Sequence, residues 1–79
     1  MERNEIQLIV NGFLVEEFEI NENLINPEAR LIEDLGISSL DFVDIVVIIE
    51  KEFGFKVKRE EITQIRTLKD MYVYIENRI

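Results

Sequence analysis

The residues best suited to chemistry are two adjacent serines, Ser38 and Ser39, that follow a glycine turn. They lie within residues 36–41, Gly-Ile-Ser-Ser-Leu-Asp, which lead into a long apolar run. This pattern is typical of the start of a helix, where free backbone N–H groups and the positive end of the helix dipole attract anions. A negatively charged group esterified to a serine at this place would therefore be electrostatically favoured.

The composition argues against catalysis by the chain itself. The sequence contains no cysteine and no histidine, so it has no thiol nucleophile, no disulfide and neither the commonest general base nor the commonest metal ligand. A serine hydroxyl without a neighbouring base is not activated for attack. We therefore expect no enzyme, and in particular no stand-alone hydrolase built on Ser38 or Ser39.

The net charge of −8 is unevenly distributed along the chain. Residues 1–49 hold eleven acids and two bases, whereas residues 50–79 hold six acids and seven bases. Such a field repels nucleic acids and anionic membranes and steers a protein toward basic patches on partners. No apolar run is long enough to span a membrane, and the N-terminus does not resemble a signal peptide. We expect a cytoplasmic monomer with protein partners.

The length and the apolar pattern predict one all-α domain over residues 1–79. We expect a small four-helix bundle, with three main helices, one short helix and a long loop between the first two helices. The loop is expected over residues 21–36, where several asparagines and the single proline disfavour a helix. Its apolar anchors are expected to be Leu24, Ile25, Leu31, Ile32 and Leu35.

The first helix is predicted over residues 5–20, but a β-hairpin is a competing interpretation. Six apolar residues recur with the spacing of one helical face: Ile6, Ile9, Val10, Phe13, Leu14 and Phe18. Asn11-Gly12 is also the strongest short signal for a hairpin turn. Gly12 inside a helix would cost about 1 kcal/mol relative to alanine. The residues alone favour the helix and leave the hairpin open.

The second helix is predicted over Leu40–Phe53, ending at Gly54. A short helix is expected within residues 59–65, and the last helix is expected to begin at Thr67, with Asp70 as a capping-box acid. The core face of this last helix is expected to comprise Leu68, Met71, Tyr72, Ile75 and Ile79.

The apolar residues of the second helix divide between two faces. The face expected to enter the core comprises Phe42, Ile45, Val46, Ile49 and Phe53. The other face combines apolar and acidic residues: Leu40, Asp41, Val43, Asp44, Val47 and Glu50. The position of Asp41 in the first turn explains its acidic side chain, because the helix dipole favours a negative charge there. The sequence shows no such structural explanation for the acidic side chains of Asp44 and Glu50. We predict a docking surface here, on which charge aids encounter and apolar contact supplies affinity.

The serine region resembles the attachment motif of the acyl carrier protein family. The lead-in Glu-Asp-Leu-Gly at residues 33–36, followed by Ile-Ser-Ser-Leu, carries the resemblance, which extends over essentially the whole chain. It implies that Ser39 bears a covalent 4′-phosphopantetheine, derived from coenzyme A by a phosphopantetheinyl transferase. It further implies that acyl thioesters on this arm are presented to acyl-loading and acyl-processing enzymes with basic patches, in fatty acid, polyketide or related biosynthesis.

Three positions depart from the family pattern. Ser38 replaces the usual Asp and is expected to cap the second helix without a charge. Lys51 stands where carriers commonly have an acid, and Lys58 where a proline is frequent. The alternative is a helical adaptor that carries nothing and binds a protein through the Leu40–Lys51 helix face.

Overall fold

Four α-helices follow one another in the computed structural model, which describes all 79 residues. They are α1 (Arg3–Phe18), α2 (Ser39–Phe53), α3 (Arg59–Ile62) and α4 (Leu68–Arg78), and a 3₁₀ turn (Glu22–Leu24) lies between α1 and α2. The expected all-α bundle, with one short helix and a long first loop, is confirmed. None of the helices has the length and apolar composition needed to cross a membrane.

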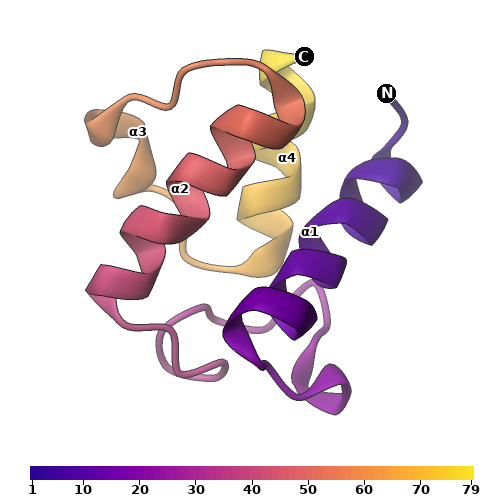
Figure 1. Ribbon diagram of the computed structural model, residues 1–79, viewed down its shortest axis with the longest axis vertical. Coiled ribbons are helices and arrows are strands. Elements are labelled where there is room, and N and C mark those ends of the chain that lie inside the picture. The colour runs from indigo at the N-terminus through magenta and orange to yellow at the C-terminus, as the bar shows by residue number, and fades with distance from the viewer.

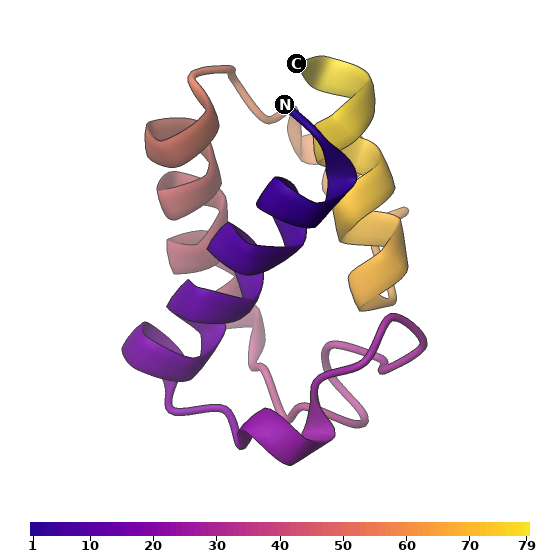
Figure 2. The same ribbon diagram turned by 90° about the vertical axis from the view of Figure 1, so that its right-hand side faces the viewer.

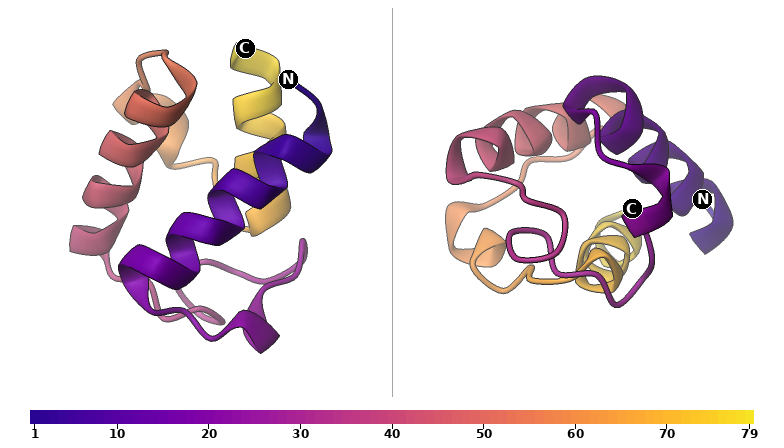
Figure 3. Two further views of the ribbon diagram at one scale, coloured as in Figure 1. Left: turned by 45° about the vertical axis from the view of Figure 1, so that its right-hand side comes forward. Right: turned by 90° about the horizontal axis from the view of Figure 1, so that it is seen from below.

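The helices form a bundle whose two ends differ. α1 lies against α4, and α2 runs along the other side of the same core (Figure 1 and Figure 2). Both termini lie at one end of the bundle, and the α1–α2 loop closes the opposite end (Figure 3). α2 begins at this closed end, so Ser39 is presented there, remote from both termini.

The segment with the competing hairpin interpretation is a helix. α1 continues through Asn11 and Gly12, and its buried residues Ile6, Val10 and Phe13 follow the predicted helical face. Asn11 Oδ1 accepts a hydrogen bond from the hydroxyl of Tyr72 in α4. The hairpin interpretation is therefore wrong, because packing of the apolar face against α4 outweighs the local preference of Asn-Gly for a turn.

The core consists of fifteen buried residues, all of them apolar or aromatic. They are Ile6, Val10, Phe13, Leu14, Ala29, Leu31, Leu35, Ile37, Ile45, Ile49, Ile65, Leu68, Met71, Tyr72 and Ile75. On α2 the predicted core face is only partly buried, since Phe42, Val46 and Phe53 are half-buried. On α4 the prediction is correct except for Ile79, which lies beyond the last helical turn and is exposed.

The long loop is fixed by a few buried side chains and by backbone hydrogen bonds. Leu31 and Leu35 are buried as predicted, whereas Leu24 and Ile32 are exposed, so their prediction as anchors is wrong. Ala29 is buried although it was not predicted as an anchor. The backbone of the loop makes three hydrogen bonds to residues at the start of α4, between 2.8 and 3.0 Å long: Leu31 N–H donates to Arg66 O, Leu68 N–H donates to Ala29 O, and Lys69 N–H donates to Pro27 O. These bonds explain how so long a loop keeps one conformation.

The two main capping boxes use the same chemistry at two helices. Ser38 Oγ accepts a hydrogen bond from the backbone N–H of Asp41 at 3.1 Å, and Asp41 Oδ2 accepts one from Ser38 N–H at 3.4 Å. Thr67 and Asp70 repeat the arrangement at α4, with both distances at 3.1 Å. The capping box expected at Thr67 is confirmed. Each box satisfies backbone donors that a helix start leaves unpaired.

The short helix α3 is held to α4 by one carboxylate. Glu61 Oε1 accepts hydrogen bonds from the hydroxyl of Tyr74 at 2.8 Å and from Arg78 Nη1 at 2.7 Å. The hydrogen bond from Tyr74, and after it the Arg78 guanidinium, lower the pKa of Glu61 below its ordinary value of 4.5. With only four residues, α3 cannot be stable by propensity alone, so these tertiary contacts hold it in place.

Two glycines should respond oppositely to alanine. Gly12→Ala should raise the free energy of unfolding by about 0.5–1 kcal/mol, because Gly12 is helical and an added Cβ meets no atom within 4 Å. Gly36→Ala should lower it by about 1–3 kcal/mol, because its φ of 70° strains an L-residue. Urea unfolding at 25 °C measures both. Destabilisation by Gly12→Ala would contradict a helical α1.

Glu61→Gln should lower the melting temperature at pH 7. A carboxyl group whose pKa is lowered by folding stabilises the protein above its unfolded pKa, and this stabilisation is lost as the pH falls through the folded pKa. The difference from the unsubstituted protein should therefore shrink below about pH 4.5. Thermal unfolding between pH 3 and pH 7 tests this, with Glu60→Gln, on an exposed neighbour, as the control. An equal deficit at every pH would refute it.

Candidate functional site

Ser39 is the first residue of α2, and its side chain is exposed. The chain reaches it through Gly36, whose positive φ turns the backbone, and through Ile37, whose side chain is buried in the core. Ser38 Oγ is engaged in the capping box, whereas the Ser39 hydroxyl makes no hydrogen bond within the protein. The two adjacent serines therefore differ, since one has a structural role and the other presents a free hydroxyl.

The surroundings of Ser39 favour an anion but supply no base. The N-terminus of the fifteen-residue α2 carries the positive end of its dipole, worth about 0.3–1 kcal/mol toward a nearby negative charge. The chain has no histidine, and no group of three or more acidic residues is arranged to hold a metal ion. No imidazole of this chain therefore stands beside the Ser39 hydroxyl.

Part of the predicted docking surface forms one continuous strip on α2. Leu40, Val43 and Val47 are 81%, 62% and 57% exposed. Asp44 is exposed, and Asp41 is half-buried through its place in the capping box. We call these five residues the α2 outer face. Large apolar side chains with this exposure on one helical face, bordered by acids, are unusual for a surface that contacts only water.

Glu50 does not share the environment of the α2 outer face. Its Oε2 accepts a hydrogen bond at 2.8 Å from the backbone N–H of Val57, in the segment between α2 and α3. The expectation that Glu50 has no structural role is therefore wrong. A bond to a backbone group seven residues away leaves no signature in the sequence, because any residue type at position 57 except proline could donate it.

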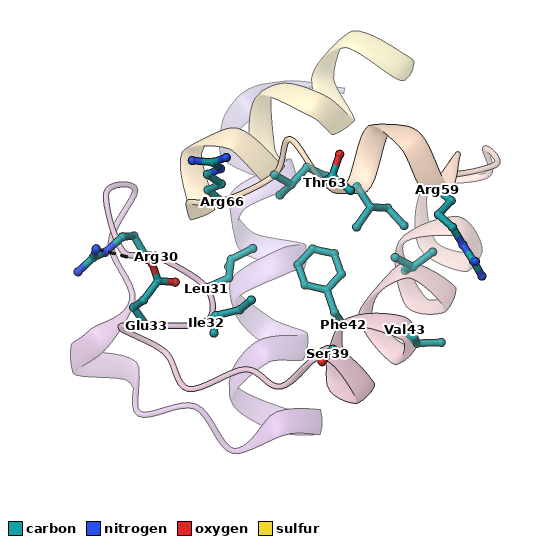
Figure 4. A pocket seen from close by; sticks show the side chains of 13 residues that line it. Arg30, Leu31, Ile32, Glu33, Ser39, Phe42, Val43, Arg59, Thr63 and Arg66 are labelled. Carbon is teal, nitrogen blue, oxygen red and sulfur yellow. Dashed lines mark ion pairs between the residues drawn. The ribbon is translucent and has the colours of Figure 1, made fainter.

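A groove of about 720 Å³ adjoins Ser39 and lies between α2, α3 and the loop before α2 (Figure 4). Its apolar wall is formed by buried or half-buried side chains: Leu31, Phe42, Val46, Ile62 and Ile65. Arginines stand at its rim, namely Arg30, Arg59 and Arg66. The sequence did not predict this groove, because its walls come from three separate segments and no periodicity connects them.

Comparisons with known proteins agree with this geometry. Residues 11–75 match the family model described as "Phosphopantetheine attachment site". The chain is 40% identical over 77 residues to the acyl carrier protein of Thermotoga maritima, which covers 98% of this chain and 95% of that protein. It is also 40% identical over 67 residues to the acyl carrier protein of Helicobacter hepaticus, covering 85% and 88%.

The structural comparison also finds an acyl carrier protein. A crystal structure of an acyl carrier protein from Thermotoga maritima superimposes with a TM-score of 0.83 at 28% identity, covering 98% of this chain and 89% of that chain. These findings support a carrier of phosphopantetheine and give no support to the adaptor alternative. The chain belongs to the acyl carrier protein family, whose members are carriers that hold acyl groups on a covalently attached 4′-phosphopantetheine.

Proposed function

We propose that Ser39 is the residue to which the 4′-phosphopantetheine is attached. The observation that carries this proposal is the contrast between the two serines. Ser38 Oγ is bound to the backbone N–H of Asp41, while the exposed Ser39 hydroxyl is free at the start of α2. A transferase can reach the Ser39 hydroxyl without breaking the cap that holds the helix start in place.

The residues of this chain supply the attachment oxygen and a favourable electrostatic environment. Ser39 Oγ forms the new bond to phosphorus while the pyrophosphate bond of coenzyme A breaks and adenosine 3′,5′-bisphosphate leaves. The proton of Ser39 Oγ passes to a base on the transferase, because no side chain of this chain hydrogen-bonds to this hydroxyl. The α2 N-terminus stabilises the resulting negative charge. When bound, the arm supplies a terminal thiol that holds an acyl group as a thioester for partner enzymes.

The α2 outer face is proposed as the surface that these partners bind. Its acids would attract basic patches on the transferase and on acyl-loading and acyl-processing enzymes, and Leu40, Val43 and Val47 would supply the buried contact area. Glu50, which the sequence placed in this surface, is left out because its carboxylate is bound to Val57 N–H. Action in the cytoplasm, as a single-domain monomer, stays a prediction.

Substitution of the two serines should separate attachment from capping. With coenzyme A, Mg²⁺ and a broad-specificity phosphopantetheinyl transferase, the unsubstituted protein and Ser38→Ala should gain the mass of one phosphopantetheine unit. Ser39→Ala should gain nothing. Ser38→Ala should lose about 1 kcal/mol of stability with its cap, and Thr67→Ala, which removes the corresponding cap of α4, controls for this loss. A mass gain in Ser39→Ala would move the site to Ser38.

Reversal of one charge on the α2 outer face should slow modification. Asp44→Lys should lower kcat/KM for the transferase about tenfold, because encounter with a basic partner loses its electrostatic steering. Glu16→Lys makes the same change in net charge on an exposed residue of α1 and should have less than about a twofold effect. Equal effects of the two substitutions would show that only net charge matters, and would reject this surface.

A further inference from the structure

Ile32 is a large apolar side chain that the fold leaves in water close to Ser39. The sequence predicted it as an anchor of the α1–α2 loop, yet it is 58% exposed. Its neighbour Leu31 takes the buried position instead and is only 1% exposed. Burial in the core therefore does not explain an isoleucine at position 32.

The exposed apolar surface of α2 continues across the groove to Ile32. Ile32, Ser39 and Val43 line the same groove, and Ser39 lies between the other two in the view of Figure 4. Val43 belongs to the α2 outer face and is 62% exposed. Ser39 is thus flanked by two exposed apolar side chains, one from α2 and one from the loop.

The turn that carries Ile32 is held in one conformation by hydrogen bonds. The carbonyl oxygen of Arg30 accepts the backbone N–H groups of Asp34 at 2.9 Å and Leu35 at 3.1 Å. The carbonyl oxygen of Ile32 accepts Gly36 N–H at 3.1 Å, and Asp34 Oδ2 accepts Arg30 N–H at 2.8 Å. A partner that covers Ile32 therefore orders little additional backbone, which leaves more of the contact energy for binding.

The position of Ile32 fits one partner. We propose that Ile32 is a contact residue for the transferase that attaches the arm, and that this enzyme covers it with an apolar surface. The inference rests on the proposed attachment at Ser39. A transferase must bring its bound coenzyme A to the Ser39 oxygen itself, so the walls of its active site enclose this residue and cover its neighbours.

Enzymes that act on the loaded arm differ from the transferase in this respect. Their chemistry takes place at the thiol end of a long, flexible arm, so they do not have to enclose Ser39. The transferase is therefore the partner whose reaction requires close cover on both sides of Ser39, over the α2 outer face and over Ile32.

Ile32 and Asp44 should act at different stages of binding. Asp44 is charged and speeds the encounter with a basic partner, an effect that salt screens. Ile32 is uncharged, so it acts after the encounter by slowing the dissociation of the complex. The defect caused by substitution of Ile32 should therefore persist at high salt, whereas the defect of Asp44→Lys should shrink.

The experiment follows modification by coenzyme A, Mg²⁺ and the broad-specificity phosphopantetheinyl transferase. Ile32→Ser should raise KM for the carrier about five- to thirtyfold and leave kcat within about twofold, because only contact area is lost. Ile32→Leu keeps an apolar side chain and should stay within about threefold of the unsubstituted KM. Leu24→Ser is the matched control, because Leu24 is 47% exposed in the same loop but does not line the groove. It should change KM by less than about twofold.

Thermal unfolding separates loss of contact from loss of structure. Because Ile32 is exposed, Ile32→Ser should change the melting temperature by less than about 3 °C, and Ile32→Thr, which keeps the β-branched shape, gives a second measurement of KM. An unchanged KM in both variants, an equal rise in Leu24→Ser, or a fall in kcat alone overturns this inference while the attachment at Ser39 stands. A mass gain that persists in Ser39→Ala overturns the proposed attachment and this inference together.

Discussion

Burial of the Ile37 side chain sets the register at which α2 begins. Gly36 turns the chain, Ile37 enters the core, and the next residue is thereby placed at the N-cap. A slip of one position toward the C-terminus would place Ser39 at the N-cap, and side chains on α2 would then be rotated by about 100°. The same slip would rotate the α2 outer face and remove Ser39 from the groove. The cap, the exposed Ser39 hydroxyl, the α2 outer face and the position of Ser39 in the groove thus depend on one buried isoleucine.

Local patterns predicted the helices well, and the errors occur where contacts between distant segments decide. The spacing of Ile6, Val10 and Phe13 identified the buried face of α1 because a helix repeats every 3.6 residues. In the α1–α2 loop no period exists, so hydrophobicity alone predicted Leu24 and Ile32 as anchors, although both are exposed. Hydrogen bonds between the loop and residues at the start of α4 determine which side chains turn inward, and sequence patterns do not encode such bonds.

In the candidate site, too, local features were predicted and features that depend on distant segments were not. Ser38 and Ser39 lie within a few consecutive residues, so the motif was enough to predict the cap at Ser38 and the position of Ser39 at the start of α2. Glu50 was assigned to the docking surface because its bond to Val57 N–H depends on the path of the following segment. The groove escaped prediction altogether, since Arg30, Arg59 and Arg66 meet only after α3 has packed beside α2. Features formed by consecutive residues could be predicted from the sequence, whereas features formed by segments that meet only on folding could not.

The placement of both termini at the end of the bundle opposite Ser39 has a practical and evolutionary consequence. Anything joined to either end of the chain, whether a neighbouring domain, an affinity tag or a solid support, would attach at the end of the bundle opposite Ser39. At the end of the bundle that holds the termini, the guanidinium group of Arg3 donates two hydrogen bonds to the carboxylate of Glu76 and so joins α1 to α4. A domain with this arrangement can therefore be fused to other domains at either terminus while Ser39 stays accessible.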